Sequence, residues 1–203
     1  MGPGPGRGPF GESVPAWLYQ EDACQLLGRY PADKYRLAFG EIAQALEVCT
    51  APMVERLLQL QALSYLIAYG DLHAKNISVQ VAREHIRLTP IYDLLSTLPY
   101  GDGDLALPLE GRDKKLERKH FLACGERIGI RPAATNHMLD ALIKGIVQHL
   151  SRLHQLGLSP PQDNPLGTHP ATTPARPGKR LNVDRITGSG VCPANSAHPA
   201  SLP

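Results

Sequence analysis

Hydrophobic residues between positions 39 and 154 recur mostly three or four residues apart, which is the spacing of amphipathic helices. This pattern predicts helices over residues 39–48, about 117–128, and about 132–154. A fourth stretch, about residues 50–69, carries apolar side chains on most of its sides. A helix that is apolar nearly all round belongs in the interior of a fold, so this one is expected to be central and buried.

The period changes to two in the middle of the chain. Residues 77–81 and 85–89 alternate between apolar and polar side chains around a turn at 83–84, which predicts a β-hairpin. Earlier in the chain, residues 20–28 predict a short helix that ends at Gly28. The sequence therefore predicts a mainly α fold with one small β-hairpin.

Composition separates a folded body from the two ends of the chain. Residues 1–16 are rich in Gly and Pro, and residues 156–203 hold nine of the 19 prolines and show no apolar period. Such segments bury too little apolar surface to offset the entropy cost of ordering, so both are expected to be disordered. One domain is expected over residues 17–155.

Charge and cysteine content limit the functional classes. A net charge of +2 and a pI near 8.4 are too mild to indicate nucleic acid or a membrane surface as a partner. The four cysteines form no Cys-x-x-Cys pair, which favours free thiols in a reducing cytosol. The most apolar stretch, residues 57–69, is too short to cross a bilayer. A soluble, cytoplasmic protein is expected.

Asp71, Asn76 and Asp93 flank the predicted hairpin. Asp71 and Asn76 lie in the loop before it, and Asp93 follows it. Because an antiparallel hairpin returns the chain to where it started, Asp93 is expected to lie close to the other two residues. Two carboxylates and an amide oxygen are hard ligands that suit magnesium rather than zinc.

Phosphoryl transfer from ATP requires such a set. One carboxylate orients the acceptor hydroxyl and takes its proton, while the Asn and the second carboxylate hold magnesium ions that bridge the phosphates. An Asp, an Asn five positions later, and an Asp beyond a hairpin have the spacing of the catalytic segment of protein kinases. An ordinary helix-ending turn is the structural alternative for the first two residues, since Gly, Asp and Asn favour turns.

Three motifs make a family resemblance specific. Residues 20–28 read Gln-Glu-Asp-Ala-Cys-Gln-Leu-Leu-Gly, residues 69–76 read Tyr-Gly-Asp-Leu-His-Ala-Lys-Asn, and residues 90–97 read Pro-Ile-Tyr-Asp-Leu-Leu-Ser-Thr. In this order they resemble the C-terminal domain of HipA-like serine/threonine kinases, the toxin component of bacterial toxin–antitoxin pairs. The resemblance covers residues 17–153 and implies a protein-kinase-like C-lobe.

The resemblance also implies roles and ligands. Asp71 would be the catalytic base, and Asn76 and Asp93 would hold Mg²⁺. The nucleotide-contacting loop would comprise His73, Ala74, Lys75 and Asn76. ATP would be the phosphoryl donor and a protein hydroxyl the acceptor, and a HipB-like DNA-binding antitoxin is an expected partner.

The sequence departs from the family at its N-terminus. The family's N-terminal lobe, with its phosphate-covering loop and nucleotide-pairing lysine, should precede Gln20, where this sequence has 19 residues. Their alternating glycines have no strand before them and no Gly-Lys-Ser/Thr after them, so they do not form a phosphate-binding loop. The chain is therefore expected to be weakly active or inactive alone, with a separate N-lobe chain as a partner.

Two other functions fit part of the pattern. The Gly-Asp-Leu-His-x-x-Asn sequence is also similar to small-molecule phosphotransferases such as aminoglycoside and choline kinases, which share the base-plus-magnesium chemistry. The motifs at 20–28 and 92–97 favour the HipA-like family over these enzymes. A non-catalytic fragment that binds a partner is the third hypothesis.

Several side chains allow more than one role. His73 is expected to support the catalytic loop rather than bind a metal or transfer a proton. Lys75 could meet a phosphate or be solvated, and Asp93 could also cap a helix beginning at Leu94. The basic residues of 112–120 are expected to form a solvated helix entry, with an acidic partner or nucleic acid as the alternative.

Overall fold

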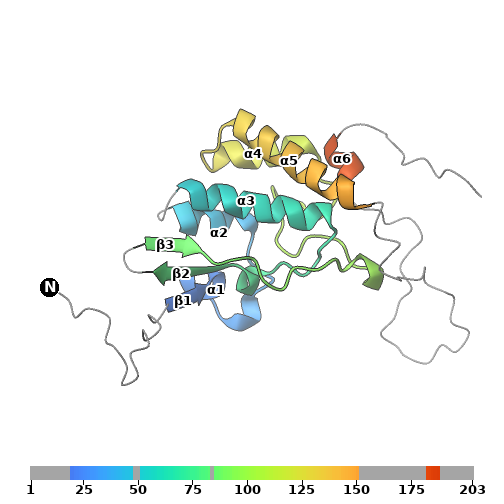
Figure 1. The fold of residues 1–203 in the computed structure, drawn as a ribbon. Coiled ribbons are helices and arrows are strands. Elements are labelled where there is room, and N and C mark those ends of the chain that lie inside the picture. The colour runs from blue at the N-terminus through green and yellow to red at the C-terminus, as the bar shows by residue number, and fades with distance from the viewer. Residues whose placement is uncertain (1–18, 48–50, 83–84, 151–181, 188–203) are drawn as a thin grey trace, which may run out of the picture.

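The computed structural model describes residues 19–47, 51–82, 85–150 and 182–187, which form a small sheet with layers of helices packed on it (Figure 1). In chain order the elements are β1 (Tyr19–Asp22), α1 (Ala23–Leu26), α2 (Phe39–Glu47), α3 (Ala51–Leu66), β2 (Ser78–Ala82), β3 (His85–Leu88), α4 (Arg118–Arg127), α5 (Pro132–Leu150) and α6 (Val183–Thr187). Short 3-10 helices cover Pro31–Asp33, Ala74–Asn76 and Leu98–Tyr100. The predicted mainly helical fold with a β-hairpin is confirmed.

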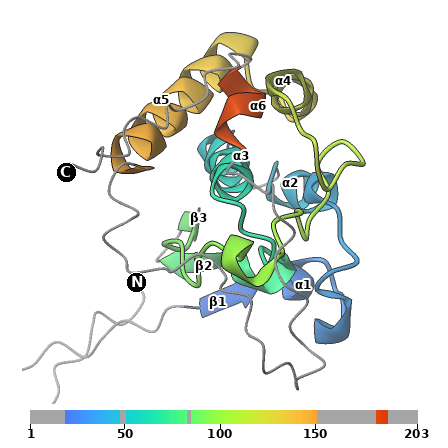
Figure 2. The same cartoon turned by 90° about the vertical axis from the view of Figure 1, so that its right-hand side faces the viewer.

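Helix α3 lies at the centre, between the sheet and an outer layer formed by α4, α5 and α6 (Figures 1 and 2). It packs against α2, α4, α5 and β3. Leu57, Leu58 and Leu66 are fully buried, as the all-round apolar pattern predicted. The helix is shorter than predicted and ends at Leu66. It cannot continue through Ala68, because that residue has a left-handed backbone with φ 54°. Residue 50, its predicted start, lies outside the described residues.

The strands pair in the order β1–β2–β3, each antiparallel to the next. The β2–β3 hairpin is where the alternation predicted it, but residues 20–22 form a strand and not the predicted helix. Gln25 N donates to Asp22 Oδ1 at 3.0 Å, and Asp22 N donates to Gln25 Oε1 at 2.9 Å. This capping box fixes the start of α1 at Ala23, so Tyr19–Asp22 pair with β2 instead.

Helices α4 and α5 match the helices predicted near the C-terminal end of the domain, except that the predicted last residues of the second helix, 151–154, lie outside the described residues. Gly129, at φ 78°, follows α4 as the predicted stop. Arg118 is the first residue of α4. Its Nη2 lies 2.6 Å from Asp140 Oδ1 on α5, and its Nε donates to the Ile186 carbonyl at 3.1 Å. These contacts hold neighbouring helices together. The other basic residues here, Arg112, Lys114, Lys115 and Lys119, are exposed, as expected of a solvated helix entry.

Helix α6 lies within the segment that composition predicted to be disordered. Val183 is 8% exposed and Ile186 1%, and α6 contacts α4 and α5. Asn182 Nδ2 also donates to the Tyr65 carbonyl at 2.8 Å. Residues 182–187 are thus ordered by docking on the domain, which overturns the prediction for this short piece.

The rest of both predicted disordered ends lies outside the described residues. Across the part of the chain that is described, no helix is both long and apolar enough to cross a membrane. Cys24 and Cys124 are buried free thiols, whereas positions 49 and 192 are not described.

Candidate active site

The loop after α3 is held at its start by Thr97. Gly70 N donates to Thr97 Oγ1 at 2.7 Å, and Thr97 N donates to the Ala68 carbonyl at 3.1 Å. A Cβ on Gly70 would lie 2.7 Å from a carboxylate oxygen of Asp102, so glycine permits this close approach. The backbone just before Asp71 is therefore tied to the 97–102 segment.

Asp71, the predicted base, is half-buried and contacts a tyrosine that the sequence did not single out. Tyr35 donates its hydroxyl proton to Asp71 Oδ1 at 2.7 Å, although the two residues are 36 positions apart. This hydrogen bond, with a further contribution from burial, raises the pKa of the Tyr35 hydroxyl. One oxygen of the carboxylate is thereby fixed in place.

The hairpin brings Asn76 and Asp93 together, as predicted. Asn76 Nδ2 donates to Asp93 Oδ2 at 3.2 Å, and Asn76 Oδ1 accepts from His73 N at 3.1 Å. Asp93 has a left-handed backbone, with φ 54°. The described chain forms no helix at Leu94, so the suggested capping role of Asp93 is not seen.

Asp71 and Asp93 act on the same buried neighbour. Burial is the main reason that the pKa of Tyr69 lies far above its ordinary value, and the charges of Asp93 and Asp71 raise it further. Both carboxylates thus disfavour ionisation of the buried Tyr69 hydroxyl.

His73 is buried and packed by two residues from the loop after α1. Its Nε2 lies 2.8 Å from Lys34 Nζ, and its ring makes an edge contact with the Tyr35 ring at a centroid distance of 5.1 Å. Burial and the nearby Lys34 charge lower the pKa of His73. This neutral, packed imidazole fits the expected supporting role.

Ala74 and Lys75 connect the loop to the start of the domain. Ala74 is fully buried and donates from its backbone N to the Lys34 carbonyl at 3.1 Å. Lys75 Nζ forms an ion pair with Asp22 Oδ2 at 2.6 Å, which raises the pKa of Lys75. Neither predicted alternative for Lys75, a phosphate contact or simple solvation, anticipated this link between two of the sequence motifs.

Tyr92 fastens the segment after the hairpin. Its hydroxyl donates to the Lys75 carbonyl at 2.7 Å and lies 2.7 Å from Ser78 Oγ. Asp93 is thus placed by its preceding residue as well as by Asn76. The sequence signal for Tyr92 was its position beside Asp93 in the third motif, but the residue itself was not assigned a role.

The amide oxygen of Asn76 and the carboxylate of Asp93 are hard oxygen donors, the type of ligand that a hard divalent cation prefers. Among the described residues there is no cluster of three or more acidic, His or Cys side chains that could hold a metal. Asp93 and Asn76 are the described residues that would hold such a cation. Asn76 now presents its amide nitrogen to Asp93, so the amide must turn before its oxygen faces a cation beside that carboxylate.

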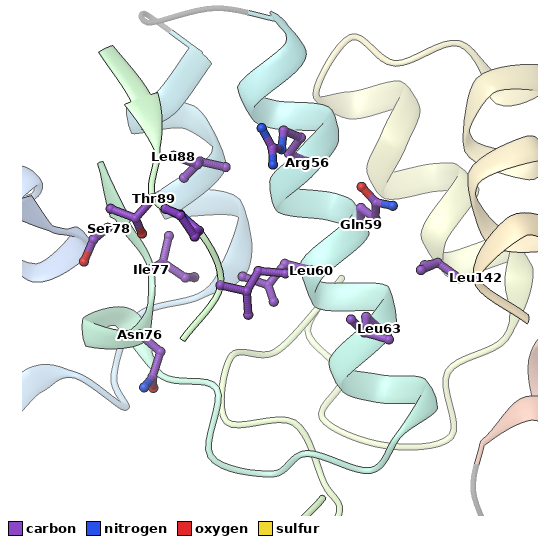
Figure 3. A pocket seen from close by; sticks show the side chains of 12 residues that line it. Arg56, Gln59, Leu60, Leu63, Asn76, Ile77, Ser78, Leu88, Thr89 and Leu142 are labelled. Atoms are coloured by element: carbon purple, nitrogen blue, oxygen red, sulfur yellow. The ribbon is translucent and has the colours of Figure 1, made fainter. Parts of the chain in front are cut away.

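A pocket of about 150 Å³ lies beside the site, between α3, α5 and the hairpin (Figure 3). Arg56, Gln59 and Leu60 line it from α3, and Leu142 lines it from α5. Asn76 is the residue that it shares with the candidate site, whereas Asp71 and Asp93 do not line it. The carboxylates therefore lie outside this pocket.

Comparison with solved structures supports the fold. The structure aligns with a chain of the Shewanella oneidensis MR-1 toxin–antitoxin complex of HipA, HipB and operator DNA, with a TM-score of 0.60 and 20% identity. The alignment covers 75% of this chain and 42% of that one.

Curated relatives carry the name of kinases. The chain is 33% identical over 92 residues to "Putative kinase Y4mE" of Sinorhizobium fredii, covering 42% of this chain and 22% of that protein. It is 39% identical over 104 residues to "Putative kinase Y4dM" of the same organism, covering 49% and 25%, respectively. A Haemophilus influenzae "Putative kinase" is 30% identical over 112 residues, covering 46% and 32%. The chain thus spans a third or less of the length of these relatives.

The family comparison agrees with the motifs. The model of the HipA-like C-terminal domain matches residues 12–150, which is well over half of the 203-residue chain and includes Asp71, Asn76 and Asp93. The chain therefore belongs to the HipA-like C-terminal domain family.

Proposed function

We propose that this domain takes part in transferring the γ-phosphoryl group of ATP to a serine or threonine hydroxyl of a protein. The observation that carries the proposal is the 3.2 Å hydrogen bond between Asn76 Nδ2 and Asp93 Oδ2, which joins the two ends of the hairpin next to the Asp71 loop. If residues 70–76 formed only a helix-ending turn, the hydrogen bond between Asn76 and Asp93 would not be needed, since Thr97 already holds Gly70 at the start of the loop.

Each residue has a task in this proposal. Asp71 orients the acceptor hydroxyl and takes its proton, with one of its oxygens held by Tyr35. Asp93 and Asn76, the latter after rotation of its amide, would hold Mg²⁺. When bound, Mg²⁺ would offset the negative charge of the ATP phosphates, and ATP would supply the phosphoryl group. His73 and Ala74 keep the nucleotide-contacting loop in shape, and Lys75 reaches a phosphate by leaving Asp22.

The partners of the domain are also proposals. By analogy with the Shewanella oneidensis complex, which contains HipA, HipB and operator DNA, we propose a cytoplasmic, toxin-type kinase that binds a HipB-like antitoxin. A lobe that covers the nucleotide, in the same or a separate chain, completes the site. The chain by itself is accordingly expected to transfer phosphate weakly or not at all.

A transfer assay with radiolabelled ATP and Mg²⁺ tests the proposal. The purified chain is incubated with a bacterial protein extract, alone and with the N-terminal part of a kinase relative added. We expect label on proteins, with Asp71→Asn lowering the rate by about 10²–10⁴-fold. Glu126→Gln, an exposed change on α4, is the control and should keep the activity.

The other functions predict different outcomes. Label on an added aminoglycoside or choline, with none on protein, would support the small-molecule enzyme. No transfer under either condition, or transfer that survives Asp71→Asn, would overturn the proposal. Metal binding has its own measurement: Mn²⁺ should broaden the NMR signals of Asn76 and Asp93 in the chain itself, and Asp93→Ala should remove the effect at Asn76.

A further inference from the structure

Two consecutive residues, Lys34 and Tyr35, contact three residues of the Asp71 loop. The Tyr35 hydroxyl donates to Asp71, the Lys34 ammonium meets His73, and the Lys34 carbonyl accepts from Ala74 N at 3.1 Å. The Tyr35 ring also packs against His73, and Lys34 Nζ lies 4.7 Å from the centre of that same tyrosine ring. These contacts form one unit, which we call the Lys34–Tyr35 clamp.

The Lys34–His73 contact fixes the state of the imidazole. A lysine ammonium has only donors, so His73 Nε2 must be the acceptor at 2.8 Å and the ring must be neutral. The ring proton then sits on Nδ1, which is buried without a partner in the described residues. His73 cannot therefore donate or accept a catalytic proton through Nε2 while Lys34 occupies it.

Lys34 also places a positive charge at the base loop. Among the described residues, no carboxylate lies within ion-pair distance of its Nζ, which lies 2.8 Å from His73 Nε2 and over the Tyr35 ring. Lys75, in contrast, has its charge balanced by Asp22 at 2.6 Å. The clamp thus differs from an ordinary ion pair that joins two surface segments.

The tyrosine has a matched neighbour that makes no such contact. Tyr30, five residues earlier, is 80% exposed, whereas Tyr35 is 50% exposed with its hydroxyl bound to Asp71. The half-exposed Tyr35 thus reaches Asp71 with its hydroxyl, whereas Tyr30 has no such contact in the described residues.

We propose that Lys34 and Tyr35 are positioning residues for phosphoryl transfer, an inference that rests on the proposed function. Tyr35 holds Asp71 Oδ1, so that Oδ2 faces the acceptor hydroxyl. Lys34 binds His73 Nε2 and keeps the loop beneath Asp71 in one conformation. The two residues form part of the surface that an acceptor hydroxyl crosses on its way to the base.

The first test uses NMR titration of the chain itself and needs no transfer activity. Removing the Lys34 charge with Lys34→Met should raise the pKa of His73. Removing the carboxylate charge with Asp71→Asn should lower the pKa of Tyr35. Lys144→Met and Tyr30→Phe, at exposed positions, should change neither titration. Unchanged titrations in both test variants would overturn the clamp, whether or not the protein transfers phosphate.

The second test uses the transfer assay under the condition in which the parent chain is active, either alone or with the added N-terminal part of a kinase relative. Because a hydrogen bond to a charged group is strong, Tyr35→Phe should lower kcat by about 10-fold. KM for ATP should stay unchanged, as should kcat in Tyr30→Phe. If the parent transfers phosphate and Tyr35→Phe does so at the same rate, the positioning role fails while the proposed function stands. If the parent is inactive both alone and with the added N-terminal part, the proposed function fails and the positioning role fails with it, even where the titrations support the contacts.

Discussion

The two ends of the hairpin differ in how firmly the fold holds them. In the Asp71 loop, Leu72 is 2% exposed, and His73 and Asn76 are each 7% exposed. In the segment that follows β3, Ile91 is 52% exposed and Leu95 is 46% exposed. The first end is built into the core, whereas the second lies on the surface.

This difference separates two parts of the proposed chemistry. A base must be held still before its substrate arrives, and the loop around Asp71 is tied to Tyr35, Lys34 and Thr97. Asp93 is placed by Tyr92 and by one hydrogen bond to Asn76. Of the two proposed metal ligands, Asp93 can therefore move to meet a cation more easily than the buried Asn76, while the proposed base stays in place.

The largest expected contrast concerns two leucines. Leu72→Ala removes a buried side chain and should lower the free energy of unfolding by about 2–5 kcal/mol. Leu95→Ala truncates a half-exposed side chain and should change it by less, within about 0.5 kcal/mol. Urea unfolding followed by circular dichroism measures both. Equal losses would show that the two ends do not differ in packing.

A smaller contrast concerns two neighbouring hydroxyl groups. Thr97→Val leaves the buried Gly70 N–H without its acceptor and should cost about 1–3 kcal/mol. Ser96→Ala removes only a long contact to Leu98 N at 3.4 Å and should stay within about 0.5 kcal/mol. Hydrogen exchange at Gly70 N should accelerate in Thr97→Val alone. Unchanged protection of this amide would mean that Thr97 does not hold the loop.

Sequence reasoning succeeded where contacts are local. The apolar period located α3, α4 and α5, and the alternating residues located the hairpin. Since a hairpin returns the chain to its start, the meeting of Asn76 and Asp93 also followed from the sequence. The roles of these residues stay predictions, because the fold places side chains without showing their chemistry.

The contacts that hold Asp71 could not be predicted in this way. Tyr35 lies 36 positions from Asp71, and Thr97 lies 27 positions from Gly70, in segments without regular period. Only the three-dimensional path of the loops brings them together. Strand β1 is a different case, because the Asp22–Gln25 spacing of a capping box was visible in the sequence and marks the helix start at Ala23.

The left-handed backbone of Asp93 offers a third contrast. Asp93→Ala and Asp93→Gly both remove the contact with Asn76, but only alanine must adopt φ 54° with a Cβ. The glycine variant should therefore be more stable by about 1–2 kcal/mol. At Asp102, which has no left-handed backbone, alanine should be the more stable substitution. Chemical unfolding of the four variants measures these differences. If Asp93→Gly is less stable than Asp93→Ala, the backbone at position 93 is not strained by a Cβ.

The smallest expected effect is the pH dependence that comes from His73. Burial and the charge of Lys34 lower its pKa below 6.5, while Asp71 and Asp93 act in the opposite direction. As the pH falls below 6.5, His73 therefore takes up a proton more readily in the unfolded chain than in the folded chain. Stability contributed by His73 is present above pH 6.5 and is lost as the pH falls through the folded-state pKa, by at most about 1.4 kcal/mol per pH unit for one proton.

Unfolding free energies measured about one pH unit above and below 6.5 test this linkage. The loss of stability on acidification should be smaller in His73→Gln than in the parent chain. It should be unchanged in His137→Gln, which alters an exposed histidine on α5. An equal pH dependence in all three proteins would mean that His73 is not held neutral by the core, and the firmly built end of the hairpin would then be more open to water than its burial indicates.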